Sequence, residues 1–123
     1  MAEVADSILL SIKQMLGGLD PTYESAFDTD IIIFINSALA TLTQLGVGPK
    51  EGYEITDDTQ TWQDFIGDDK RLNLVKTFVY LDVKCVFDPP RMSFVLEALK
   101  DKRDEHLWRL NHWVDLDGTT TDV

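Results

Sequence analysis

Apolar residues recur along most of the chain at intervals of three and four, which is the spacing of one helix face. The clearest case begins near Asp28, a suitable N-cap, and ends at Gly46, a typical helix terminator. The five consecutive apolar residues 31–35 would also suit a buried strand, but the longer helical period favours a helix. Its apolar stripe is Ile31, Ile35, Leu39, Leu42 and Leu45.

Three further helices are predicted before and after the helix that begins near Asp28. The first runs from Asp6 or Ser7 to Leu16 and ends at a pair of glycines. One turn of helix is predicted at 62–66. A helix at about 69–87 carries two apolar stripes, so it is expected at the centre of the fold, and the Asp88-Pro89-Pro90 sequence ends it. The stripes are Leu72, Val75, Val79 and Val86 on one side and Leu74, Phe78, Leu81 and Cys85 on the other.

The last predicted helix runs from Ser93 as N-cap to Trp113, about 21 residues or about 31 Å. Arg103 interrupts its apolar stripe. Between the helices, residues 46–61 are rich in glycine and polar residues, and the alternation at 53–56 predicts a short strand in a hairpin-like excursion. The interrupted stripe is Leu96, Leu99, Leu107, Leu110 and Val114.

These elements predict a mainly α fold, a small bundle of about four to five helices with a long C-terminal helix and a short β excursion at 46–61. With 123 residues, of which 44% are hydrophobic, the chain suits one soluble domain. We expect that domain at 1–114. The polar residues 115–123 are predicted to form a flexible acidic tail.

The charge is strongly negative and unevenly distributed. The chain has 22 acidic and 11 basic residues, a net charge of −11, which argues against a generic nucleic-acid binder. Residues 1–69 hold 13 acids and two bases, whereas residues 70–109 hold nine bases and six acids. The only basic region is therefore formed by the two last predicted helices.

No arrangement of residues indicates catalysis, a cofactor or a metal. His106 and His112 are six residues apart, whereas a metal pair on one helix needs a spacing of three or four. Cys85 lies in an apolar stretch and is interpreted as a small buried hydrophobic residue. N-capping and solvation explain the acid pairs 57–58 and 68–69, with Asp64 between them, more simply than magnesium binding or acid–base work.

Two further segments resemble ligand-binding motifs but do not match them, and no targeting signal is recognised. Residues 46–50 contain glycines and a lysine but lack the spacing of a phosphate-binding loop. Residues 115–118 resemble part of a calcium loop, but its closing glutamate would fall beyond the chain. A single cysteine, an N-terminus without a basic signal region and the short apolar run at 31–35 predict an intracellular protein without a membrane span.

The tryptophans are the more informative aromatic residues. Trp62 is interpreted as a core residue. Trp108 and Trp113 lie on the far half of the long last helix beside Arg109, a composition typical of interface hot spots. We therefore expect a partner to contact this part of the helix.

Taken in order, several segments resemble the head–tail connector (head-completion adaptor) proteins of long-tailed bacteriophages. The resemblance covers about residues 6–113, and it depends on the ordered set rather than on any single motif. The segments are Ser7 to Lys13, Leu16-Gly17, Asp30 to Ser37, Thr43 to Pro49, Trp62 to Ile66, Val75 to Leu81, Phe87 to Pro90 and Glu105 to Asn111.

The resemblance implies a non-enzymatic virion protein at the head–tail interface, assembled in the host cytoplasm. Such subunits form a ring of about twelve copies beneath the portal, in a head-to-tail closure. The ring extends the channel for genomic DNA, which passes without sequence-specific binding, and it docks a stopper or tail-completion protein. In this family the C-terminal helix tends to contact the portal.

A ring of this kind needs two different complementary patches on each subunit. The acidic N-terminal region and the later basic helices are candidates, and reversing the charges on the last helix is expected to weaken assembly. The competing hypothesis is an acidic DNA mimic that inhibits a nucleic-acid-binding protein, although the mixed signs at 70–109 argue against it. A helical enzyme subunit is a third, weaker alternative, because no catalytic site is present. The predicted contacts are Lys100, Lys102, Arg103, Trp108, Arg109 and Trp113.

Overall fold

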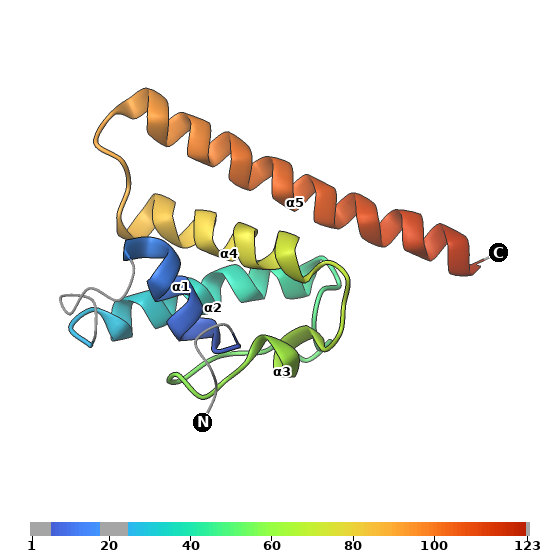
Figure 1. The fold of residues 1–123 in the computed structure, drawn as a ribbon. Helices are drawn as coiled ribbons and strands as arrows, with labels where there is room; N and C mark the ends of the chain where they lie inside the picture. The colour runs from blue at the N-terminus through green and yellow to red at the C-terminus, as the bar shows by residue number, and fades with distance from the viewer. Residues whose placement is uncertain (1–5, 18–24, 123) are drawn as a thin grey trace.

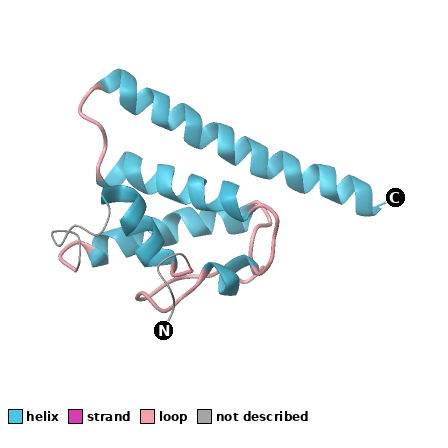
Figure 2. Ribbon diagram, in the orientation of Figure 1, coloured by secondary structure: helices cyan, strands magenta, loops and turns pink. Residues whose placement is uncertain are grey.

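A computed structural model of the chain describes residues 6–17 and 25–122, with the side chains of the last helix described as far as His112. Five helices form in these residues, and no strand does (Figures 1 and 2). The mainly helical prediction is therefore confirmed. The helices are α1 (Ile8–Gly17), α2 (Asp28–Gln44), α3 (Trp62–Ile66), α4 (Leu72–Phe87) and α5 (Ser93–Asp122).

Helix α4 is the central element, as its two apolar stripes predict. It contacts α1, α2 and α5, and Figure 1 shows it between α5 on one side and α1 with α2 on the other. Val75, Phe78 and Val79 are buried in the main core. Val86 departs from the prediction, since its side chain is 54% exposed. Val86 lies one residue before the end of α4, on a side of the helix that stays in solvent.

The helix starts depend on local hydrogen bonds. Ser7 caps α1 as predicted, because its Oγ accepts a hydrogen bond from the Leu10 backbone N–H at 3.1 Å. The predicted cap of α2 is wrong. Asp28 is the first helical residue rather than the cap, and its carboxylate forms an ion pair with the buried Lys13 of α1 at 2.8 Å. A long-range ion pair has thus replaced the local cap.

The predicted β excursion at 46–61 is also wrong for the described residues. Instead of a strand partner, the Asn36 side chain of α2 binds the backbone of Ile55. Its Oδ1 accepts from the Ile55 N–H at 2.7 Å, and its Nδ2 donates to the Ile55 carbonyl at 3.0 Å. Gln60 Oε1 accepts hydrogen bonds from the backbone N–H groups of Thr56 and Asp57. In this loop, side chains rather than a neighbouring strand form the hydrogen bonds that the backbone needs. The alternation at 53–56 therefore reflects the burial of Ile55 and not a sheet.

The end of this loop is tied to the start of α1. An isolated antiparallel bridge joins Ser7 to Thr61, and backbone hydrogen bonds run from Ile8 to Gln60 and from Trp62 to Asp6. Trp62 is buried as predicted, and its indole N–H donates to Ser11 Oγ at 2.9 Å. These bonds fix α3 against α1.

Helix α5 lies along α4 (Figure 1), and Ser93, the predicted N-cap, is its first helical residue rather than its cap. Its backbone stays helical past the predicted end at Trp113. The predicted flexibility of 115–123 concerns residues whose side chains lie outside the described part, and it stays a prediction, as does the 1–114 domain boundary.

Candidate oligomer and partner interface

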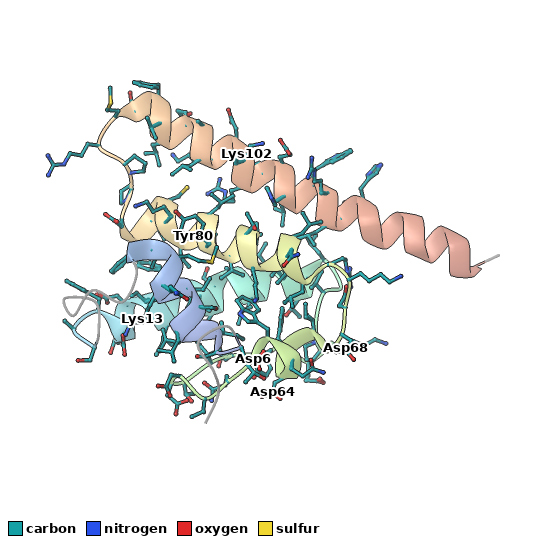
Figure 3. The ribbon with its side chains drawn as sticks, viewed as in Figure 1. Asp6, Lys13, Asp64, Asp68, Tyr80 and Lys102 are labelled. Atoms are coloured by element: carbon teal, nitrogen blue, oxygen red, sulfur yellow. The ribbon has the colours of Figure 1, made fainter. Side chains whose placement is uncertain are left out.

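All six predicted contact residues belong to α5. Five of them have described side chains, and the sixth, Trp113, lies outside the described side chains. Helix α5 packs against α4 along one face, so the remainder of its circumference faces outward, where Figure 3 shows Lys102. The geometry of each residue decides what α5 offers to a partner.

The cations of α5 are largely paired within the helix. Lys100 lies 3.6 Å from Glu97, and Lys102 lies 3.6 Å from Glu105. Arg109 also lies 3.2 Å from a Glu105 carboxylate oxygen. Exposed pairs at these spacings contribute at most a few tenths of a kcal/mol each, but they reduce the free positive charge of the surface. The basic region of the sequence therefore does not form a strongly positive patch on α5.

Arg103 differs from the others because it turns towards α4. Its guanidinium lies 3.7 Å from the Asp82 carboxylate of α4 and 3.1 Å from Asp104, and only a quarter of its side chain is exposed. Burial raises the pKa of Asp82, and the nearby Arg103 opposes that increase. Arg103 thus holds α5 on α4 and is poorly placed to contact a partner.

Trp108 is the strongest candidate contact. Its side chain is 59% exposed, and its ring stacks on His112 with the centroids 4.3 Å apart. A large aromatic side chain that is held in one orientation and left in solvent is typical of interface hot spots. The exposure of Trp108 is compatible with the predicted partner contact, which stays a prediction.

Two apolar residues near the start of α5 were missed from the sequence. Met92 is 56% exposed and Phe94 is 67% exposed, and Val86 near the end of α4 is 54% exposed. Part of the signal was available, because Phe94 lies two residues before Leu96 and therefore off the apolar stripe that faces α4. Met92 lies four residues before Leu96, in register with that stripe, but it precedes the first helical residue, Ser93. These three exposed residues lie close to the α4–α5 connection in the sequence, and we name them the apolar corner.

A set of carboxylates occupies the opposite side of the molecule, which we name the acidic face. Figure 3 shows Asp6, Asp64 and Asp68 there, across α4 from Lys102 of α5. All its members are exposed, and the described residues offer none of them an ion-pair partner within 4.0 Å. Hydrogen bonds from Thr59 lower the pKa of Asp57, which keeps this carboxylate ionised. The acidic face is defined by Asp6, Asp64 and Asp68 (Figure 3), and we count with it the exposed acids of the 46–61 loop that leads to α3, which are Glu51, Glu54, Asp57 and Asp58.

The remaining candidate groups are structural. Cys85 is buried between α4 and α5, and burial raises the pKa of its thiol, which disfavours the reactive thiolate. His106 Nδ1 lies 2.9 Å from the Lys102 carbonyl oxygen. Within the described residues, no group of three or more His, Cys, Asp or Glu side chains has the arrangement needed to hold a metal ion. No helix in that part is long and apolar enough to cross a bilayer.

Comparison with known proteins assigns the chain to a family. The family model described as phage connector protein matches residues 8–116, which is most of the chain. The chain belongs to the phage connector protein family. Neither the curated proteins nor the solved structures gave a match. As a phage connector protein, the chain has a structural role in a virion and associates with other head and tail proteins. The resemblance inferred from the ordered segments is thereby confirmed.

Proposed function

We propose that this phage connector protein forms a closed ring of about twelve copies beneath the portal, extending the DNA channel and docking a stopper or tail-completion protein. The observation that carries the proposal is the family match over residues 8–116. The ring lies at the head–tail interface of the virion and is assembled in the host cytoplasm. No catalytic role is assigned to any residue.

The arrangement of the two surfaces supports such a ring. The acidic face and α5 lie on opposite sides of α4 (Figure 3), so one side can face the channel while the other contacts neighbouring proteins. Because the α5 cations are already paired with acids of the same helix, charge attraction alone is a weak source of ring contacts. The exposed apolar and aromatic side chains of α5 are better suited to bury area between proteins.

The acidic face suits the wall of the channel. Genomic DNA carries closely spaced phosphates, and a wall of ionised carboxylates repels them instead of binding them. Lys50 is the only base at 46–69, so nothing in that segment offers a strong phosphate contact. The outer part of α5, with Lys102, Trp108 and Arg109, is then left for the portal.

Native mass spectrometry across a concentration series, with and without the isolated portal, tests this proposal. We expect a single closed species of about twelve subunits, formed by the chain alone or on the portal. Monomers under every condition would contradict it. Salt-sensitive capture of a DNA-binding protein by such monomers would instead support the acidic DNA mimic.

A further inference from the structure

We propose that α5 is exchanged between neighbouring copies in the assembled ring, leaving α4 of its own chain and packing on α4 of the next one. The hinge is the connection at 88–92. This inference rests on the proposed ring and adds the contact that would hold it together.

The first observation is that α5 buries few of its described side chains completely, although it packs along α4. Among its described side chains, Leu110 is the one that is buried, and residues 93–106 contain none. The middle of the face against α4 is occupied by Arg103, paired with the partly buried Asp82, where a leucine would continue the stripe. A half-buried ion pair contributes less than packed aliphatic side chains, and it fixes the register of the two helices. The Arg103–Asp82 pair therefore makes the α4–α5 contact specific in register.

The second observation concerns the connection itself. Residues 88–92 link α4 and α5 and contain Pro89 and Pro90, which favour extended backbone at and before them. Five extended residues span up to about 16 Å, which is long enough for the helix to point away from its own α4 instead of folding back on it as in the single chain. Exchange of an identical element then re-forms every α4–α5 contact between chains, so little interaction energy is lost.

The third observation is the apolar corner, formed by Val86, Met92 and Phe94 on either side of this hinge. These side chains are more than half exposed in the single chain. In an exchanged arrangement the hinges of adjacent copies run alongside each other, which buries these side chains against a second copy. Such burial favours the exchanged form over the closed one by about 25 cal/mol for each Å² of apolar surface covered. In the proposed ring, α5 of the next copy takes the place on α4 that the chain's own α5 occupies in the single chain.

A cysteine pair tests the exchange directly, because Cys85 is the single cysteine of the chain. Leu99 precedes Arg103 by one turn on α5, and Cys85 follows Asp82 by about one turn on α4, so antiparallel packing brings the two positions together. The Leu99→Cys variant is first oxidised as a dilute monomer, and loss of two hydrogens in the mass spectrum verifies that the pair bridges. Reduced chains are then assembled, oxidised as rings and separated on a non-reducing denaturing gel.

We expect a ladder of covalently linked dimers, trimers and larger species up to the full ring. Cross-linked monomers alone from intact rings would overturn the exchange and leave the ring proposal standing. Absence of rings with and without the portal would overturn both. Lys102→Cys is the matched control, because this outward side chain is 62% exposed and cannot reach Cys85 of either chain.

A second measurement avoids the substitution. An image reconstruction of the wild-type ring, with the 88–92 connection traced, should show it crossing to the neighbouring copy. A connection that folds back onto its own α4 would overturn the exchange.

Discussion

Gly48 lies in the left-handed region with a φ of +84°, and a Cβ placed on it would lie 2.5 Å from Cε1 of Phe65. Gly46 has a nearly identical φ of +86° but open space around the Cβ position. The two glycines therefore share the backbone requirement and differ only in the contact. This pair separates conformational strain from steric overlap.

We expect Gly46→Ala to lower the free energy of unfolding by about 1 kcal/mol, because only the backbone is strained. Gly48→Ala should lower it by about 2–4 kcal/mol, since it also displaces the buried Phe65 ring. Urea denaturation of both variants measures the difference. Equal losses would show that Phe65 moves aside freely.

The two hydrogen bonds between the Asn36 side chain and the Ile55 backbone yield a second prediction. Asn36→Ala leaves the Ile55 N–H and carbonyl without these partners, and we expect a loss of about 1–3 kcal/mol in stability. Ser37→Ala, on an exposed position of the same helix, is the control and should stay within about 0.5 kcal/mol of the wild type. A neutral Asn36→Ala would mean that water satisfies the loop backbone equally well.

At the scale of elements, the α4–α5 contact should depend on pH through Asp82. Its pKa is raised above the ordinary 3.8 by burial, so its contribution to stability falls as the pH rises through that raised pKa. Arg103→Met removes the opposing cation and raises this pKa further. We expect a loss of about 1–3 kcal/mol at pH 7 that shrinks as the pH falls towards 4, where Asp82 becomes neutral.

The control is the double variant Asp82→Asn with Arg103→Met, whose stability relative to the wild type should recover at pH 7. Thermal unfolding at several pH values measures both variants. A loss in Arg103→Met that does not change with pH would show that packing of the arginine stem, rather than its charge, is responsible.

Helices were predictable from the sequence where buried residues repeat along one face. The prediction failed where the local structure depends on one side chain that is distant in the sequence. The period of Ile31 to Leu45 correctly outweighed the strand-like run within it. The alternation around Ile55 misled, because the Asn36 amide takes the place of a neighbouring strand. Asp28 misled for a similar reason, since its partner Lys13 lies on another helix.

The candidate site was predictable only in part. Exposed Trp108 followed from composition and position, whereas the inward turn of Arg103 depends on Asp82 of the preceding helix. Spacing along α5 places Arg103 on the apolar stripe, but the sequence does not reveal which acid faces it. The apolar corner was missed because it forms only when the connection leaves Val86, Met92 and Phe94 uncovered.

At the scale of the whole molecule, the outer part of α5 should contact the portal mainly through its aromatic side chain. We expect Trp108→Ala to weaken portal binding at least about tenfold, as for a central hot spot. Lys100→Glu with Lys102→Glu should weaken it only a few-fold, because surface charges of this kind contribute little. Binding of each variant to immobilised portal measures the difference. A larger loss for the charge reversals would show that charged side chains, rather than Trp108, provide most of the binding.

The central claim is that this connector forms a ring on the portal, and imaging the two together tests it most directly. Purified chain is mixed with isolated portal and examined by electron microscopy with averaging along the portal axis. The account predicts an added ring of density on that axis, built from about twelve copies with α5 towards the portal. A bare portal alongside monomeric chain, at concentrations well above those of assembly, would contradict it.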